Sequence, residues 1–313
     1  MRVPVLVFGA LALVVMAGPS LAPYAPGRQF EGYPYVPPMR PHVIDAAGVW
    51  HAPFAYPLRL VDPIERRYAE DRTRRISFDS AEPWFLFGSD PLARDVLSRL
   101  LAGARLSLGV ALLSTVLALL IGATVGGLAG YAGGWTDTVL MRFADLVLVL
   151  PAIYIVLALR GVLPLVLTTT DAFAGFVAVL ALVGWPSAAR GVRGIVVVER
   201  RSEYAEAARA LGASAPRVIV RHLLPATRGF LAVQATVLVP AFIMAEATLS
   251  FVGLGFAPPT PSWGAMLRDA AAVQTTADTP WLLAPAAALV LTVFVVHAAA
   301  GFRDPLPGTR HDT

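Results

Sequence analysis

Apolar residues come in six long runs along this chain, separated by polar segments. Because the hydrocarbon core of a bilayer is ~30 Å thick, a helix needs about 20 apolar residues to cross it. The pattern therefore predicts six transmembrane helices in an all-α integral membrane protein, with a long polar segment after the first span. The predicted spans are residues 3–22, 106–130, 139–159, 172–189, 229–253 and 281–302.

Arginines in the connecting segments predict the orientation of these spans. Residues 190–228 hold eight arginines and three glutamates, whereas 160–171 and 257–280 hold one arginine each. Short cytoplasmic loops are enriched in basic residues, so 190–228 is expected on the cytoplasmic side of a cell membrane. Six spans then place both termini in the cytoplasm. The expected parts are a first helix (1–22), an external segment (23–104), a five-helix core (105–302) and a cytoplasmic tail (303–313).

The first apolar run has a second interpretation. Arg2, the apolar stretch and Ser20-Leu21-Ala22 also resemble a signal peptide with a small-residue cleavage site. Cleavage would leave five spans and an external N-terminus, with the remaining topology unchanged.

The expected external segment differs in composition from the rest of the chain. Between residues 23 and 87 it is rich in proline and aromatic residues. Repeated proline disfavours long helices, and aromatic residues disfavour simple disorder. We therefore expect a small ordered subdomain with little regular structure. The charged run 66–75 is either a solvated face or a docking surface for an external partner.

Composition narrows the classes of function. Hydrophobic residues make up 57% of the 313 residues and charged residues 15%, which argues against an ordinary soluble enzyme. All 25 basic residues are arginine, and cysteine is absent. The chain therefore lacks a Walker A lysine, a Schiff-base lysine and a thiol nucleophile, and any ATP chemistry must come from another chain. Arginines at membrane edges explain the net charge of +4 without nucleic acid.

Residues 201–225 predict a helix, a sharp turn and a second short helix. Ser202 is a suitable N-cap, and Gly212 stands where a left-handed C-cap is needed. Pro216 can begin the second helix, and Pro225 is expected to end it. The first helix carries several alanines. They either allow another protein surface to approach the backbone closely or serve only helix propensity in a connecting loop.

The same stretch resembles a known family signature. Glu206-Ala207-Ala208, then Gly212, then His222 with Leu224-Pro225, is similar to the EAA loop of binding-protein-dependent ABC importer permeases. Segments 87–99, 103–108, 245–255 and 258–264 match the dipeptide/oligopeptide branch, and its second, C-type permease subunit. The chain departs from the family pattern at three positions. His222 replaces isoleucine, Ser89 replaces threonine and Ala93 replaces glycine.

The resemblance implies a type I importer permease that is not itself an enzyme. Its implied partners are a second permease, two ATP-binding subunits, an external solute-binding protein and the bilayer. ATP would bind to the partner subunits, and no catalytic, cofactor or metal site is expected in this chain. The implied substrates are di- or oligopeptides, with nickel chelates or other small solutes as alternatives. A stand-alone secondary transporter and an integral membrane enzyme are the competing classes. The implied ATPase-coupling residues are Glu206, Ala207, Ala208, Gly212, Leu224 and Pro225.

Polar residues within the apolar runs are further candidates. Glu246 lies 18 residues after Arg228, or ~27 Å along a helix, which places it near the outer face. It is either a gate or pathway residue or a structural group. Asp145 and Arg142 are expected to be local ion-pair or interface residues, and His297 is expected to pack or to reach the inner interface. Trp263 is expected to anchor at the outer interface.

Overall fold

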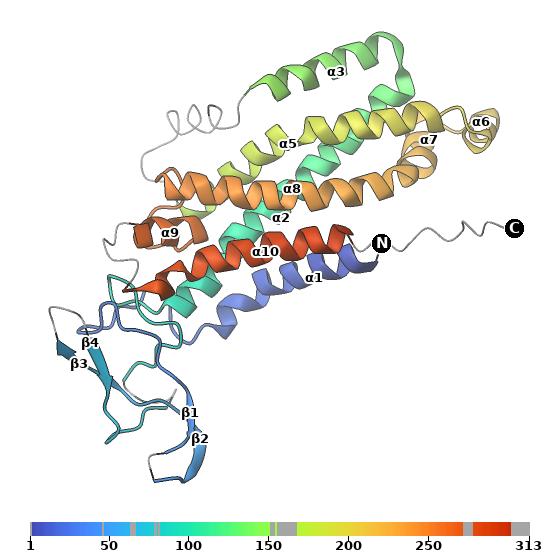
Figure 1. Cartoon of the computed structure of the whole chain (residues 1–313). Coiled ribbons are helices and arrows are strands. Elements are labelled where there is room, and N and C mark those ends of the chain that lie inside the picture. The colour runs from blue at the N-terminus through green and yellow to red at the C-terminus, as the bar shows by residue number, and fades with distance from the viewer. Residues whose placement is uncertain are drawn as a thin grey trace, which may run out of the picture.

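Helices dominate the computed structural model, which describes residues 2–45, 47–62, 67–77, 80, 82–150, 154, 168–271 and 278–301. Figure 1 shows most of them side by side in an elongated bundle, with a β-rich segment at one end and the short helix α6 (Glu203–Ala210) at the other. The other helices are α1 (Arg2–Ala17), α2 (Val96–Ala132), α3 (Gly134–Val149), α5 (Thr169–Glu199), α7 (Ala215–Val218), α8 (Arg228–Phe251), α9 (Trp263–Ala271) and α10 (Ala284–Gly301).

Four helical runs in the described part of the chain are long and apolar enough to cross a membrane. They span residues 96–132, 169–199, 215–251 and 280–299. Of the six expected spans, the first and third correspond to α1 and α3, which have 16 residues each and fall short of the usual length. Most of the second half of the third expected span lies outside the described residues, as does the tail 303–313.

Two helices extend beyond the expected spans, because charged residues at their ends have partners. Helix α2 begins at Val96 rather than after Ala104, since the Asp95 side chain caps it by accepting a 2.7 Å hydrogen bond from the Ser98 amide. Helix α5 continues past Ala189 to Glu199, through Arg190 and Arg193. These two arginines pair with Asp145 and Asp137 of α3, and the Arg193 Nε–Asp137 Oδ1 distance is 3.0 Å.

A further difference concerns Pro225. Helical backbone runs without a break from Ala215 to Phe251, through a π-helical turn (Ile219–Leu223) and a 3-10 turn (Leu224–Thr227). A proline in the first turn of a 3-10 segment gives up no needed backbone hydrogen bond, so Pro225 alters the helix type instead of ending the helix.

Close packing of α2 on α5 holds the bundle together. Gly122, Gly126 and Gly130 recur every fourth residue on α2 and face α5. A Cβ atom built at Gly126 would lie 2.3 Å from the Ala189 carbonyl oxygen, so the two backbones are in direct contact there. Small residues at this spacing allow such contact between membrane helices. Leu13, Leu120, Phe143 and Phe294 are large apolar side chains exposed on other faces, as expected for surfaces that meet lipid.

The β-rich segment forms two antiparallel hairpins, so the chain is not wholly α-helical. One hairpin pairs β1 (His42–Ile44) with β2 (Trp50–Phe54), and the other pairs β3 (Leu58–Asp62) with β4 (Arg67–Glu70). A separate apolar core lies beneath them, formed by Phe30, Val36, Met39, Ala55, Ile76, Trp84 and Phe85. The segment is thus ordered as expected, although it holds more regular structure than proline content alone suggests.

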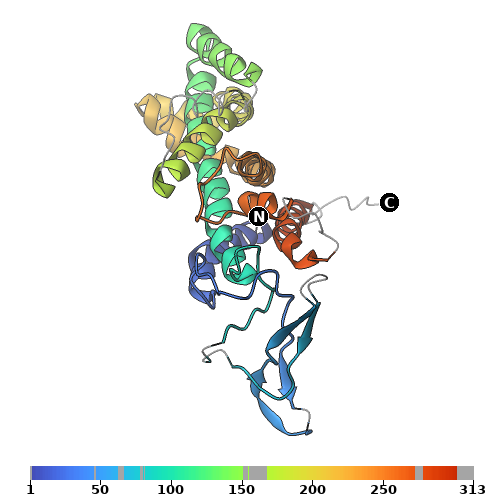
Figure 2. The ribbon, with the colours of Figure 1, turned by 90° about the vertical axis from the view of Figure 1, so that its left-hand side faces the viewer.

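Hydrogen bonds attach this segment to the bundle. The Tyr24 amide donates to Ser98 Oγ at 3.0 Å, and Trp281 Nε1 donates to the Ser89 carbonyl at 3.0 Å. In Figure 2, where the left-hand side of Figure 1 faces the viewer, the hairpins extend beyond α1 and α10. Together the two views place the segment at the end and to one side of the helices.

Candidate functional site

Helix α6 lies at the end of the bundle opposite the β-rich segment, and its sequence explains both of its ends (Figure 1). Ser202 has the extended backbone of an N-cap, with ψ 151°, although its hydroxyl donates back to the Glu199 carbonyl at 2.6 Å. At the other end Gly212 has φ +80°, as expected from the sequence. The Ala213 amide reaches the Ala208 carbonyl at 3.0 Å and the Gly212 amide reaches the Arg209 carbonyl at 2.9 Å. This pair of bonds is a Schellman motif.

The two faces of α6 are sharply different. Ala205 and Ala208 are buried in a cluster with Val192, Val196, Val218, Ile219 and Leu223. Glu203, Glu206, Ala207 and Ala210 are exposed on the remaining surface, and Leu211 is 89% exposed. The alanines therefore act in two ways. Ala205 and Ala208 let α6 pack closely on its own chain. Ala207 and Ala210 form an exposed surface of small side chains that a partner could approach closely.

Arginine side chains connect α6 rigidly to the long helices. Arg200 donates from Nη1 to the carbonyls of Gly130 and Tyr131, at 3.0 and 3.1 Å, and so completes the C-terminal end of α2. Arg209 of α6 donates to the Arg200 carbonyl at 2.8 Å. Tyr204 donates to the Glu199 carboxylate, and this hydrogen bond raises the pKa of Tyr204. Hydrogen bonds therefore join α6 to Arg200 at the end of α5, and Arg200 in turn to the end of α2.

Gly212 offers a direct test of this local structure. No atom lies within 4 Å of a Cβ built there, so any cost of substitution comes from the backbone alone. We expect Gly212→Ala to destabilise the α6 turn by about 1 kcal/mol and Gly212→Val by more, because the left-handed conformation disfavours a Cβ. Hydrogen exchange of the α6 amides measures the effect. Gly194→Ala, at a right-handed helical position with open space around it, is the matched control and should leave α6 protection unchanged.

The other residues of the signature lie between α6 and α8 and are partly buried. Leu224 packs at the edge of the cluster beneath α6, and Pro225 is half-buried in the 3-10 turn that leads into α8. His222, the departure from the family pattern, is also half-buried. The structure thus brings Glu206, Ala207, Ala208 and Gly212 together on one helix and its cap, with Leu224 and Pro225 supporting them.

Glu246 lies far from this site, near the other end of α8. The residue is fully buried, and its Oε1 accepts a 2.6 Å hydrogen bond from Ser250 Oγ one turn later. Oε2 has no partner in the described part of the chain. Gly253 ends α8 with φ +91° and its own Schellman bond, from the Leu254 amide to the Leu249 carbonyl at 2.9 Å. The helix end is therefore capped without help from Glu246.

Trp263 was expected at the membrane interface, and that expectation was wrong. It opens α9 as a buried residue, 4% exposed, because each of its N–H groups has an internal partner. Its amide donates to Ser107 Oγ at 3.1 Å and Nε1 to the Leu100 carbonyl at 3.0 Å. These bonds fix α9 against α2.

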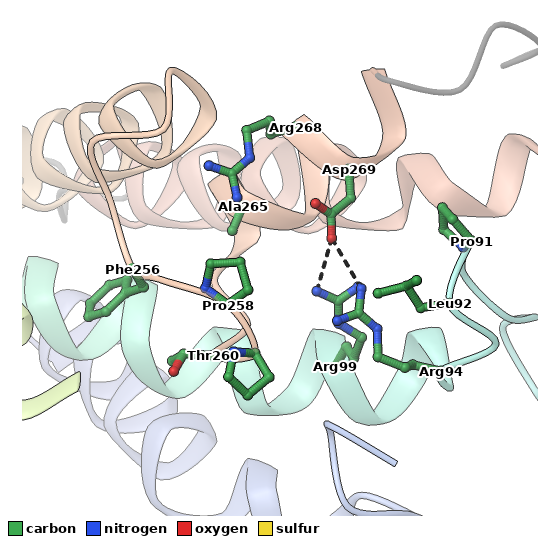
Figure 3. A pocket seen from close by; sticks show the side chains of 11 residues that line it. Pro91, Leu92, Arg94, Arg99, Phe256, Pro258, Thr260, Ala265, Arg268 and Asp269 are labelled. Carbon is green, nitrogen blue, oxygen red and sulfur yellow. Dashed lines mark hydrogen bonds and ion pairs between the residues drawn. The ribbon is translucent and has the colours of Figure 1, made fainter. Parts of the chain in front are cut away.

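Sequence reasoning missed a buried ionic cluster at the same end. Asp90, Arg94 and Arg99 are each at most 5% exposed. Asp90 Oδ2 accepts from Arg94 Nε at 2.6 Å and also from Arg99. Asp269 of α9 accepts from Arg99 at 3.1 Å and from Arg94 at 3.3 Å, as Figure 3 shows. The cluster joins the segment before α2 to α9. Segment 87–99 contains Asp90, Arg94 and Arg99, but their pairing with the distant Asp269 left no signal in local spacing.

The remaining polar candidates are structural. Asp145 pairs with Arg190, as expected, whereas Arg142 faces a cleft between α3 and α5. His297 is exposed, and its Nδ1 lies 2.9 Å from the Val293 carbonyl of its own helix. Among the described residues, no group of three or more acidic or histidine side chains could hold a metal ion.

Comparison with known proteins agrees with this architecture. Residues 122–305 match the family model "Binding-protein-dependent transport system inner membrane component". The chain is 36% identical over 254 residues to the oligopeptide transport system permease protein OppC of Bacillus subtilis, covering 80% of each protein. It is 38% identical over 230 residues to the dipeptide permease DppC of the same organism, covering 72% of this chain and 69% of DppC.

The glutathione transport system permease protein GsiD of Pectobacterium atrosepticum is 33% identical over 272 residues, covering 86% of this chain and 87% of GsiD. The matched family region includes α6, its glycine cap, Glu246 and α9. The resemblance seen in the sequence is confirmed. This chain belongs to the family of inner membrane components of binding-protein-dependent transport systems, the permeases of ABC importers.

Proposed function

We propose that this chain is the C-type permease subunit of an ATP-driven importer for di- or oligopeptides. It would form the translocation path with a second permease and couple to two separate ATP-binding subunits, which bind the ATP. An external solute-binding protein would deliver the substrate. The names of the relatives, which describe oligopeptide, dipeptide and glutathione permeases, support the substrate class.

In this proposal the chain crosses a bacterial inner membrane six times. α1 contributes Leu11 to the main apolar core and packs on α2 and α10, which supports a retained first span rather than a cleaved signal peptide. α3 would begin the third span. Both termini and α6 would lie in the cytoplasm, and the β-rich segment would lie outside, at the other end of the bundle (Figure 1).

One observation carries the coupling role of α6. It is a solvent-facing helix whose buried face is fixed to α5 and whose neighbour Arg200 is bonded to the end of α2. A partner that moves α6 would therefore move two long helices together, and such a rigid two-state element is what coupling between distant sites requires. Glu206, Ala207 and Gly212 would meet the ATPase surface. Ala208, Leu224 and Pro225 would hold them in place.

We expect Glu206→Arg to abolish most substrate-stimulated ATP hydrolysis by the reconstituted importer. The Glu206 carboxylate is exposed, and its one ion-pair partner among the described residues is Arg209, at 4.0 Å. A surface pair at this distance contributes little to folding stability. Charge reversal should therefore spare the fold and disturb only the docked face. ATP hydrolysis, peptide uptake and co-purification of the ATPases are measured together.

Glu31→Arg is the matched control, since Glu31 is an exposed carboxylate in the β-rich segment at the other end of the molecule. If Glu206→Arg and the control hydrolyse ATP equally well, α6 is not the coupling helix. Peptide uptake by liposomes that contain this chain without ATPases, driven by an ion gradient, would contradict the importer itself.

Glu246 is proposed as a structural residue. It is enclosed where α8 meets α9, and Gly264 of α9 approaches so closely that a Cβ there would lie 2.3 Å from the Ala247 carbonyl oxygen. Such packing leaves no open path beside the carboxyl group, which supports a role in seating α9 over a role in a gate.

A further inference from the structure

A cavity of about 260 Å³ lies beside the ionic cluster, between the segment before α2, the loop 256–260 and α9 (Figure 3). Part of its wall is apolar and includes Leu92, Phe256 and Pro258. Another part is cationic and is formed by Arg94, Arg99 and Arg268. The cavity is therefore a small apolar hollow with guanidinium groups along one side.

Three arginines and one aspartate line the cavity. Arg94 and Arg99 share the carboxylates of Asp90 and Asp269, two cations with two anions. Arg268 forms no hydrogen bond or ion pair with any residue that the structure describes. In the part of the chain that the structure describes, the Arg268 guanidinium at the cavity wall thus has no ion-pair partner.

A buried donor is also unused. Arg99 Nε is enclosed, with the side chain 4% exposed, and has no acceptor among the described residues. Asp95, the other carboxylate nearby, does not line the cavity: its Oδ2 accepts from the Ser98 amide and hydroxyl at 2.7 and 2.6 Å, and its Oδ1 is likewise buried without a partner among the described residues. Buried donors in folded proteins normally have acceptors, and among the residues that line the cavity in the described part of the chain Arg99 alone has such an unpaired buried atom, so the polar wall suits an anionic acceptor.

The chemistry of the walls defines that acceptor. Guanidinium groups bind carboxylates through paired, charge-assisted hydrogen bonds, which gain strength where water is excluded. The apolar wall fits a hydrocarbon side chain next to the carboxylate. The volume lies just below the ~300–1,000 Å³ of sites for larger small molecules, so it suits a group the size of one amino-acid residue.

We propose that this cavity binds a peptide on its way to the translocation path. The groups that it would recognise are the carboxylate and the apolar side chain of the peptide's carboxyl-terminal residue. The assignment to a peptide rests on the proposed function. Carboxylate binding does not rest on that function, because such binding needs neither ATP nor the ATPases.

Titration calorimetry of the full chain in lipid nanodiscs tests the proposal with two probes. N-acetyl-leucine carries a carboxylate on an apolar body, and N-acetyl-leucinamide has the same shape without the charge. We expect saturable binding of the acid and at least about ten-fold weaker binding of the amide, as for loss of a charged hydrogen-bond partner. Equal binding of the two probes, or saturable binding of neither, would overturn the proposal.

Two variants locate the site. Arg268→Gln should weaken binding of the acid by about ten-fold or more, whereas Arg105→Gln, at an exposed arginine of α2 outside the cavity, should leave it unchanged. Leu92 is 52% exposed, so it tolerates substitution. Leu92→Glu should abolish binding by placing a carboxylate at the cavity, and Leu92→Gln should not. Unchanged binding in Arg268→Gln would refute the site.

The same carboxylate chemistry could be presented by an acidic side chain of the external binding protein. If Arg268→Gln weakens docking of that protein but leaves binding of N-acetyl-leucine unchanged, the solute site is excluded. Peptide uptake driven by an ion gradient without ATPases, with N-acetyl-leucine still bound, would remove the importer function and leave the carboxylate site standing.

Discussion

Asp90→Ala is expected to destabilise the folded chain by about 3–5 kcal/mol, because it leaves Arg94 and Arg99 buried next to a single remaining carboxylate. The substitution also removes an acceptor for the backbone amides of Leu92 and Arg94, each 2.9 Å from Asp90 Oδ1. Unfolding by titration of SDS into lipid–detergent micelles measures the change in free energy of unfolding.

The matched comparison is Asp269→Ala. Asp269 accepts hydrogen bonds from the same two arginines, but its side chain is 30% exposed and it binds no backbone amide that the structure describes. Water can replace part of its role, so its removal should cost clearly less than the removal of Asp90. If both variants cost the same, burial of Asp90 is not what makes the cluster important.

The sequence predicted those features that depend on local chemistry. Gly212 could be recognised because a helix of strong formers ends directly before it, and a left-handed residue is needed there. Four apolar runs, 106–130, 172–189, 229–253 and 281–302, lie within or largely overlap helices long enough to cross a membrane. Glu206, Ala207, Ala208 and Gly212 of the family signature lie on α6 and its cap, where capping and packing both restrict the residue types in one short segment.

Features that depend on pairing between distant segments were missed. Arg105 and Arg190 were taken as ends of spans, whereas α2 begins earlier, at Asp95, and α5 continues through Arg190 to pair with Asp145. Trp263 was placed at an interface because its neighbours are prolines, yet its hydrogen bonds reach Ser107 and Leu100 on another helix. Hydropathy records the charge or the aromatic ring of one residue and contains nothing about its partner.

The glycine stripe on α2 is an exception, because its signal was present in the sequence. Gly122, Gly126 and Gly130 follow the every-fourth-residue spacing typical of close helix contacts in membranes. We expect Gly126→Ala to destabilise the bundle by about 3 kcal/mol, since the new methyl group would lie 2.3 Å from the Ala189 carbonyl oxygen and 2.9 Å from Val192 Cβ. Backbone, rather than a flexible side chain, would have to move.

The same substitution at other glycines provides a graded series. At Gly127 the nearest atoms are side-chain carbons of Ile219 and Leu224 at 3.3 Å, so Gly127→Ala should cost little. At Gly194 of α5 no atom lies within 4 Å, and alanine should be neutral or stabilising by up to about 1 kcal/mol. In SDS unfolding, the loss of unfolding free energy should therefore be largest for Gly126→Ala, smaller for Gly127→Ala and absent for Gly194→Ala. A bundle that tolerates Gly126→Ala as well as Gly194→Ala would show that α2 and α5 are not in direct backbone contact.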